Sequence, residues 1–198
     1  MNLKFSTHED FLTFKAILKQ RLSSFEIKKV HVTDFIPSAV MILFMNKDNE
    51  AQVFLTKRTN KVATHKGEVS FPGGRIDKGD KDAMAASFRE TFEEAGILSE
   101  DIEIIGRFDE YYSFMGFHVS TFVGIIDYPY DYKINTAEIE TTFEAPLSIF
   151  YNKEYDRIED FEFYHKDMKV YYYSYKGFTI WGLTARILTE FAEKILKD

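Results

Sequence analysis

Three glutamates, Glu90, Glu93 and Glu94, stand close together in the sequence, and Arg89 directly precedes them. Residues three and four apart share one face of a helix, where like charges repel by on the order of a few tenths of a kcal/mol per pair. A helix with a purely structural role gains nothing from this crowding. Oxygen ligands gathered in this way suit a divalent cation such as Mg²⁺. The residues therefore indicate metal-assisted chemistry at a phosphate group.

A glycine-rich turn, Pro72-Gly73-Gly74, precedes the helix that carries these acids. Glycine leaves its carbonyl open to an ion, because no side chain stands in the way. Alone the turn is weak evidence, since such sequences are common in ordinary loops. Arg89 can anchor a neighbouring carboxylate through its planar guanidinium. Together these features favour a metal and phosphate site over the alternative interpretation, a solvated acidic helix face.

The helix is predicted over about residues 82–95. At about 100° per residue, five of its residues form an apolar stripe: Met84, Ala85, Phe88, Phe92 and Ala95. The three glutamates fall on the opposite side. We therefore expect the stripe to face the core and the acids to face outward.

Hydrophobic periodicity predicts the elements that must position this helix. Ser6 and Glu9 predict a capping box for an N-terminal helix that packs as a flap on the main body. Strands are predicted at residues 39–45, 53–56, 68–71, 102–108 and 118–126, an aromatic hairpin at 161–164 and 170–175, and helices from Pro146 and over 183–196. Helices interleaved with strands and hairpins predict the α/β class, a sandwich with a mixed sheet.

Composition limits the classes of protein that this chain can belong to. With 198 residues, of which 45% are hydrophobic, the chain can form one substantial core. The net charge of -7 gives no general attraction for nucleic acid, and the absence of cysteine excludes disulfides and thiolate zinc sites. No apolar run approaches the roughly 18 residues of a membrane helix, and charges interrupt the N-terminal stretch. We expect a cytoplasmic protein with no signal peptide and no membrane partner.

The acidic helix and the turn before it resemble the Nudix box. That box reads Gly, five residues, Glu, seven residues, then Arg-Glu-aliphatic-any-Glu-Glu-any-Gly-aliphatic. The matching residues here are Gly74, Arg89, Glu90, Glu93, Glu94, Gly96 and Ile97. Thr91 replaces the aliphatic residue, Asp80 stands in place of the first glutamate, and eight residues separate Asp80 from Arg89.

The aspartate and the extra residue are features of a subfamily, the coenzyme A pyrophosphatases. Its upstream motif resembles the segment from Phe54 to Thr59, followed at family spacing by Gly67 and by Phe71-Pro72-Gly73-Gly74. Ala63 stands where the motif has its second arginine, which bears on recognition of coenzyme A. The residues that could substitute for it are Lys61, His65 and Lys66.

The resemblance implies a Nudix-type α/β/α sandwich with a mixed sheet over residues 37–198, and an N-terminal helical extension over residues 1–36. It implies a pyrophosphatase that uses Mg²⁺ or Mn²⁺ and splits coenzyme A or an acyl derivative into adenosine 3′,5′-bisphosphate and a 4′-phosphopantetheine. Two alternatives stay open. One is a Nudix hydrolase of another nucleoside diphosphate derivative, such as ADP-ribose or a dinucleotide. The other is a non-catalytic module that senses a nucleotide. The oligomeric state is also open.

The resemblance also assigns roles at the metal. Glu90, Glu93 and Glu94 would supply carboxylates, and the Gly73 carbonyl would assist them. Glu90 is the family's common candidate for activating water. Arg89 would orient the glutamates without touching the substrate.

Further residues are predicted around that centre. Glu138 and Glu140 are candidates for a distal base, and their alternative role is solvation of a loop. Cations that would bind the phosphates of the substrate are Lys57, Arg58, Lys61, Lys66 and Arg75. The alternative interpretation of these cations is an ordinary basic loop.

Overall fold

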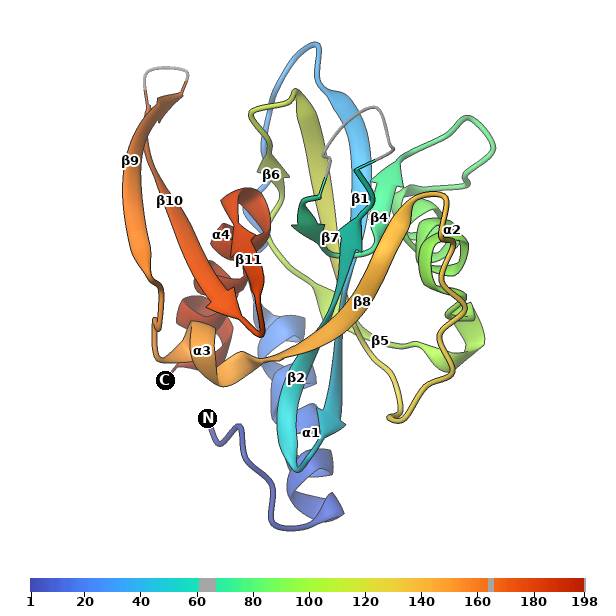
Figure 1. The fold of residues 1–198 in the computed structure, drawn as a ribbon, viewed down its shortest axis with the longest axis vertical. Helices are drawn as coiled ribbons and strands as arrows, with labels where there is room; N and C mark the ends of the chain where they lie inside the picture. Colours follow the sequence, from blue (N-terminus) through green and yellow to red (C-terminus); the bar gives the residue numbers. More distant parts are fainter. Residues whose placement is uncertain (61–66, 164–165, 198) are drawn as a thin grey trace.

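A twisted mixed sheet of eight strands forms the centre of the protein (Figure 1). The structure is a computed structural model that describes residues 1–60, 67–163 and 166–197. The strands of this sheet are β1 (Ile36–Lys47), β2 (Glu50–Arg58), β3 (Val69–Ser70), β4 (Gly73–Arg75), β5 (Glu103–Arg107), β6 (Tyr111–Tyr112), β7 (Phe117–Ile125) and β8 (Ile139–Pro146).

The longest strand, β1, organises the sheet. It pairs in parallel with β7 and antiparallel with β2 and β4, while β2 also pairs with β3 and β8. Asp48 and Asn49 join β1 to β2 with positive φ angles of 55° and 60°. Such a two-residue turn matches the twist of a hairpin, and the polar sequence Lys47-Asp48-Asn49 itself predicts a turn here.

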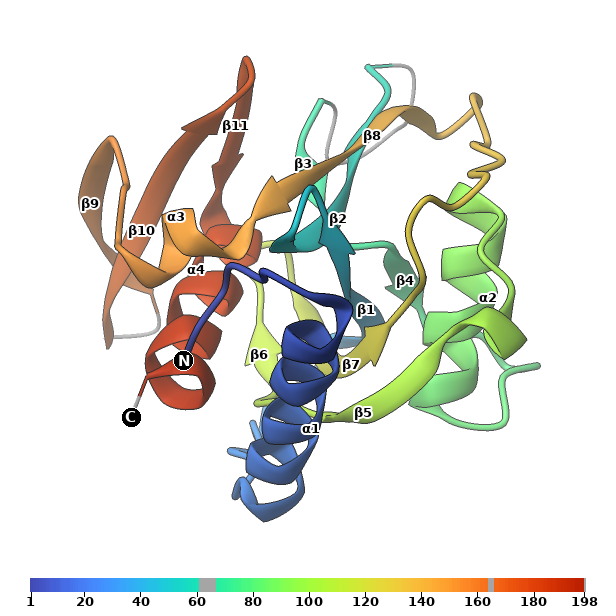
Figure 2. The same ribbon diagram turned by 90° about the horizontal axis from the view of Figure 1, so that it is seen from below.

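Helices cover both faces of the sheet, as Figure 2 shows. Side chains alternate along β1, so that Ile42 and Phe44 enter one core while Leu43 and Met45 enter the other. The first core includes residues of α1 and α4, and the second includes residues of α2. The helices are α1 (His8–Ser24), α2 (Ala83–Ala95), α3 (Leu147–Tyr151) and α4 (Gly182–Phe191), which continues into the π-helical turn η2 (Ala192–Leu196). The predicted fold class, a sandwich with a mixed sheet and an N-terminal helix, is confirmed.

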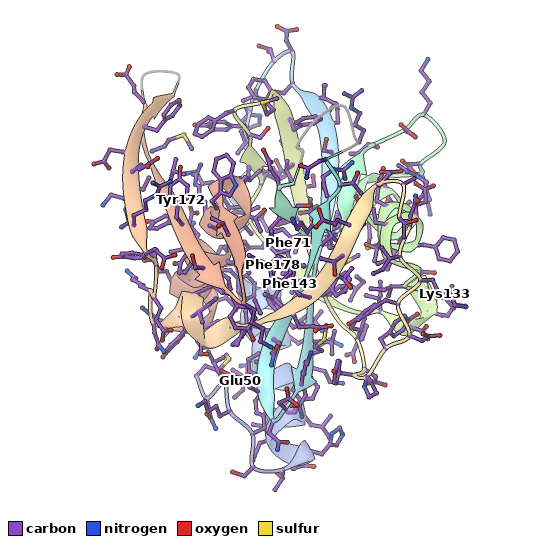
Figure 3. The ribbon with its side chains drawn as sticks, viewed as in Figure 1. Glu50, Phe71, Lys133, Phe143, Tyr172 and Phe178 are labelled. Atoms are coloured by element: carbon purple, nitrogen blue, oxygen red, sulfur yellow. The ribbon has the colours of Figure 1, made fainter. Side chains whose placement is uncertain are left out.

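A second, three-stranded antiparallel sheet contains the aromatic hairpin. Its strands are β9 (Arg157–Phe163), β10 (Lys166–Tyr175) and β11 (Phe178–Trp181). Tyr173 is fully buried, and its hydroxyl lies 2.8 Å from that of Thr189 in α4. Phe178 stacks on Phe143 of β8 with ring centroids 4.0 Å apart (Figure 3). The aromatic residues thus join the small sheet to the large one.

The N-terminal segment is tied to the main body by its backbone as well as by its apolar face. Phe14 and Leu18 of α1 are buried in the first core. The guanidinium of Arg21 donates to the carbonyls of Ile195 and Lys197 at 2.8 and 2.9 Å. No helix in the described part of the chain is long and apolar enough to cross a membrane.

Several local predictions were wrong or incomplete. The segment Pro72–Gly74 was expected to end a strand, but Gly73–Arg75 pairs with β1 as β4. Backbone hydrogen bonds to β1 hold this strand in the sheet. Its side chains do not, so its sequence shows no apolar periodicity. Strands β6, β8 and β11 lie outside the residue ranges predicted as strands. The helix cap is Thr7 with Asp10, one residue beyond the predicted Ser6 and Glu9.

The cap of α1 gives a direct test of this assignment. The Thr7 side chain accepts from the backbone N–H of Asp10 at 3.2 Å. Thr7→Ala should therefore lower the free energy of unfolding by about 1 kcal/mol. Ser6→Ala should change it by less than about 0.5 kcal/mol, as is usual for a surface substitution. Urea unfolding of both variants checks the order, and a larger loss for Ser6→Ala would identify Ser6 as the cap.

Candidate active site

Helix α2 turns a different face to the sheet from the one that was predicted. Phe92 is 53% exposed and Met84 is 38% exposed, whereas Glu94 is only 1% exposed. The residues of α2 that are buried are Ala86, Ser87, Thr91, Glu94 and Ala95. The expected outward direction of the acids is therefore wrong for Glu94. Of the predicted apolar stripe, Met84 and Phe92 are exposed, whereas Ala95 is buried and Phe88 packs against the second core.

Small side chains explain why this face can be buried. They let the helix approach β1 and β4 closely, and the two hydroxyls find partners within the helix. Ser87 donates to the Met84 carbonyl and Thr91 to the Ser87 carbonyl, both at 2.7 Å. A buried hydroxyl with a hydrogen bond avoids the cost of lost hydration.

The two ends of α2 fix its position. Asp82 caps the first turn by accepting from the Ala85 N–H at 2.8 Å, and Gly96 ends the helix in the left-handed conformation with φ of 69°. The last carbonyls accept from the next loop, because the N–H of Lys133 donates to Ala95 and that of Asn135 donates to Glu94. Lys133 lies beside the end of α2 in Figure 3. This loop then leads to Glu138.

Arg89 contacts three acids of the site, Asp80, Glu90 and Glu93. Its Nε and Nη2 lie 3.0 and 2.9 Å from the two carboxylate oxygens of Asp80, which is a bidentate pair. Its Nη1 donates to Glu90 at 2.8 Å and to Glu93 at 3.1 Å. The bond to Asp80 is the main reason why the pKa of Arg89 is raised, and Arg89 in turn lowers the pKa of Asp80. Sequence reasoning assigned Asp80 no role beyond its place in the box.

Arg58 likewise contacts two acids, Glu94 and Glu138. This last residue of β2 donates from Nη1 to Glu94 Oε1 at 2.7 Å, and its Nη2 lies 3.5 Å from Glu138 Oε2. Burial raises the pKa of Glu94 to about 8, while Arg58 acts in the opposite direction. The second oxygen of Glu94, Oε2, is buried and has no hydrogen-bond partner among the described residues.

The close approach of α2 to β4 depends on Gly74. A Cβ atom on Gly74 would overlap the carboxyl group of Glu90, so glycine lets that side chain lie in its present position against β4. Burial raises the pKa of Glu90, and the charges of Glu90 and Glu138 also raise the pKa of Glu94. The three carboxylates therefore lie near enough to interact.

The described residues fit a metal that is only partly held by protein. No group of three or more carboxylate or imidazole side chains converges closely enough to bind an ion in the part of the chain that the structure describes. The arginines hold several of the acids, and Glu93 lies at the exposed rim. However, Mg²⁺ commonly takes one or two carboxylates and completes its shell with water and substrate phosphates. Glu90 and the unpartnered oxygen of Glu94 meet that requirement.

The other candidates fall into separate groups. Lys57 pairs with Glu140 at 2.8 Å, so Glu140 is held by Lys57 while Glu138 is held by Arg58. The guanidinium of Arg75 lies 5.7 Å from the centre of the Phe117 ring, and the Arg75 carbonyl accepts from Arg89. The predicted cations Lys61 and Lys66, with Ala63 and His65, lie outside the described residues.

Comparison with known proteins identifies the family. The model of the NUDIX domain matches residues 35–167. Nudix hydrolase 22, a chloroplastic protein of Arabidopsis thaliana, is 32% identical over 95% of this chain and 66% of its own length. The uncharacterized Nudix hydrolase NudL of an Enterobacter strain is 33% identical over 96% of this chain and 95% of its own. The chain belongs to the NUDIX domain family.

A solved structure agrees with this assignment at the level of the fold. The MutT protein of Methanosarcina mazei has a TM-score of 0.54 at 18% identity, with 88% of this chain and all of that chain covered. The chain spans 66% and 55% of the two plant relatives, and the second of these is named Nudix hydrolase 15, mitochondrial. These relatives are named as Nudix hydrolases, and the chain is similar to them over most of its own length.

The burial of Glu94 predicts how stability depends on pH in metal-free protein. The pKa of Glu94 is about 8 in the folded state against 4.5 for the free group, so the folded state binds the extra proton between these values. The free energy of unfolding should therefore fall as the pH rises through this range, by at most about 1.4 kcal/mol per pH unit. Glu94→Gln should remove this slope in urea unfolding with EDTA present.

Glu93→Gln is the matched control, because it removes a carboxylate from the same helix whose side chain is 49% exposed. It should keep the slope of the wild type. An unchanged slope in Glu94→Gln would contradict the raised pKa.

Proposed function

We propose that the protein hydrolyses coenzyme A or acyl-coenzyme A at its diphosphate, giving adenosine 3′,5′-bisphosphate and a 4′-phosphopantetheine. One observation carries the proposal. The upstream segment that resembles the coenzyme A subfamily and the Nudix box meet at one point, because Arg58 of that segment bonds to Glu94 of the box at 2.7 Å. Both sequence features therefore belong to a single site.

We further propose that Glu90 and Glu94 hold Mg²⁺ or Mn²⁺, with Glu93 and the Gly73 carbonyl as additional donors. When bound, the metal neutralises the diphosphate, polarises a phosphoryl oxygen and lowers the pKa of its water. The roles of the protein residues are orientation and proton transfer. Arg89 orients Glu90 and Glu93 through bonds of 2.8 and 3.1 Å while Asp80 fixes its guanidinium.

The proton from the attacking water needs an acceptor. Glu90 and Glu138 are the two candidates that the geometry supports, because both lie near Glu94. Glu138 is 44% exposed and reaches the site from a loop, so it can accept a proton and return it to solvent. Glu140 is less well supported, because it pairs with Lys57.

Two alternative functions differ in the residues that they require. A Nudix hydrolase of ADP-ribose or a dinucleotide would use the same acids, and Ala63 in place of the second arginine of the motif keeps this alternative open. A non-catalytic module would have no need of the three acids, which are all present. We propose a small-molecule nucleotide as the partner and the cytoplasm as the location.

The metal centre predicts that activity needs both the ion and Glu90. EDTA should abolish hydrolysis, and Mg²⁺ or Mn²⁺ should restore it. Glu90→Gln should lower kcat by about a hundredfold or more, the size expected when an electrostatic contribution to the transition state is lost. Initial rates at several metal concentrations test this, with melting temperature as a check of folding.

Glu100→Gln is the control for that substitution, because Glu100 is an exposed carboxylate in the turn after α2 and outside the site. It should retain the kcat of the wild type. Normal turnover by Glu90→Gln would contradict the proposed metal centre.

The 3′-phosphate of coenzyme A predicts a preference between two closely matched substrates. A charge-assisted contact to this phosphate contributes about 1.5–3 kcal/mol, which corresponds to roughly ten- to hundredfold in kcat/KM. Coenzyme A should exceed its dephospho form by that factor when both are assayed beside ADP-ribose. Equal values for the two, or faster hydrolysis of ADP-ribose, would contradict the coenzyme A assignment and leave the Nudix chemistry standing.

A further inference from the structure

Arg58 is placed differently from a residue that is free to bind substrate. Its side chain is 19% exposed, and its Nη1 is only 2.7 Å from Glu94 Oε1. Its Nε is buried and has no hydrogen-bond partner among the described residues. Lys57, the preceding residue, bonds to Glu140 instead. The neighbouring cations Lys57 and Arg58 of β2 therefore pair with different acids.

The pair between Arg58 and Glu94 offsets part of the free-energy cost of burying the Glu94 carboxylate. A carboxylate that is removed from water costs several kcal/mol unless a partner offsets the charge. Arg58 supplies the opposite charge, and it does so from one side only. Oε1 is engaged by the guanidinium, whereas Oε2 remains without a partner among the described residues. The guanidinium thus holds the carboxylate through Oε1, and the backbone N–H of Gly73 lies near enough to lower the pKa of the same group.

Arg58 also joins two segments that are distant in the sequence. Its Nη2 reaches Glu138 at 3.5 Å, while the backbone N–H of Asn135 donates to the Glu94 carbonyl at 3.0 Å. The planar guanidinium fixes the angle between its two nitrogen donors, which the point charge of lysine cannot do. The backbone pairing of β2 with β8 brings Glu138 to this point, and the Arg58 guanidinium then holds its carboxylate near the end of α2.

We propose that Arg58 is a positioning residue, which holds Glu94 by one oxygen so that the other faces the metal and which keeps Glu138 beside that carboxylate. This inference rests on the proposed function. It replaces the phosphate-binding role that the sequence predicted for Arg58, because Arg58 then acts through Glu94 and not on the substrate phosphates. A substrate clamp would mainly affect KM. A positioning residue affects kcat and the affinity for the ion.

Steady-state kinetics separate the two roles. Arg58→Gln removes the charge and Arg58→Lys keeps it without the planar fork. Partners that orient metal ligands typically contribute about 10- to 100-fold in metal affinity or activity. Arg58→Gln should therefore lower kcat by about that factor with KM within about threefold. Arg58→Lys should also lose kcat, because one ammonium cannot hold Glu94 and Glu138 together.

Lys47→Gln is a matched control for the loss of a half-buried ion pair. Lys47 pairs with Glu144 of β8 at 2.8 Å, and these side chains are 21% and 10% exposed. The substitution should lower the melting temperature while kcat stays at the wild-type value. Comparing melting temperatures across the three variants separates lost stability from lost positioning.

Mn²⁺ binding to the substrate-free protein provides a readout that does not depend on turnover. Free Mn²⁺ measured by electron paramagnetic resonance should give a dissociation constant about tenfold higher for Arg58→Gln. In a Glu94→Gln background, Arg58→Gln should have no further effect on this constant, since the carboxylate that it orients toward the ion is gone. This measurement remains informative if the substrate proposal fails.

Three results would overturn the proposal. The first is a raised KM with unchanged kcat and unchanged Mn²⁺ affinity, which would make Arg58 a substrate clamp. The second is tighter Mn²⁺ binding by Arg58→Gln, which would make Arg58 a competitor of the ion. The third is an undiminished effect of Arg58→Gln in the Glu94→Gln background.

Discussion

The site depends on one buried charge, the carboxylate of Glu94. An ionised group at 1% exposure is stable only when an opposite charge and hydrogen bonds replace its lost water. This requirement fixes three parts of the fold together. Strand β2 must end where Arg58 can reach Glu94, helix α2 must lie close to β4, and the loop after α2 must return along its end. The pair with Arg58 at 2.7 Å meets part of the requirement, because burial still raises the pKa of the Glu94 carboxyl in the metal-free protein.

Two arginines from different elements divide the acids between them. Arg89, within α2, holds Asp80, Glu90 and Glu93, and Arg58, on the sheet, holds Glu94. Each guanidinium reduces the mutual repulsion of carboxylates that would otherwise weaken the helix. Because the acids are held before any ligand arrives, little reorganisation is needed when charge develops during the reaction. The same arrangement explains why no three acids converge by themselves in the described part of the chain.

The sequence was a good guide to elements with a strong local signal. Strand β1, its turn at Asp48 and helix α2 follow from apolar runs, turn residues and spacing, which act over a few residues. It was a poor guide where a distant partner decides the structure. Strand β4 exists because β1 offers free backbone groups, and the pairing of Glu138 with Arg58 requires a loop return that no local pattern encodes.

The shift of the buried face of α2 has a physical cause of the same kind. Large side chains such as Phe92 in the contact would hold the helix away from β4, and Glu90 could then no longer lie against Gly74. The helix therefore packs through Ser87, Thr91 and Ala95, and it leaves Phe92 exposed. Thr91, which departs from the aliphatic residue of the box, fits this contact because its hydroxyl bonds to the Ser87 carbonyl. The sequence contained a signal for this packing, namely small residues four apart beside the clustered acids. A count of apolar residues alone does not detect it.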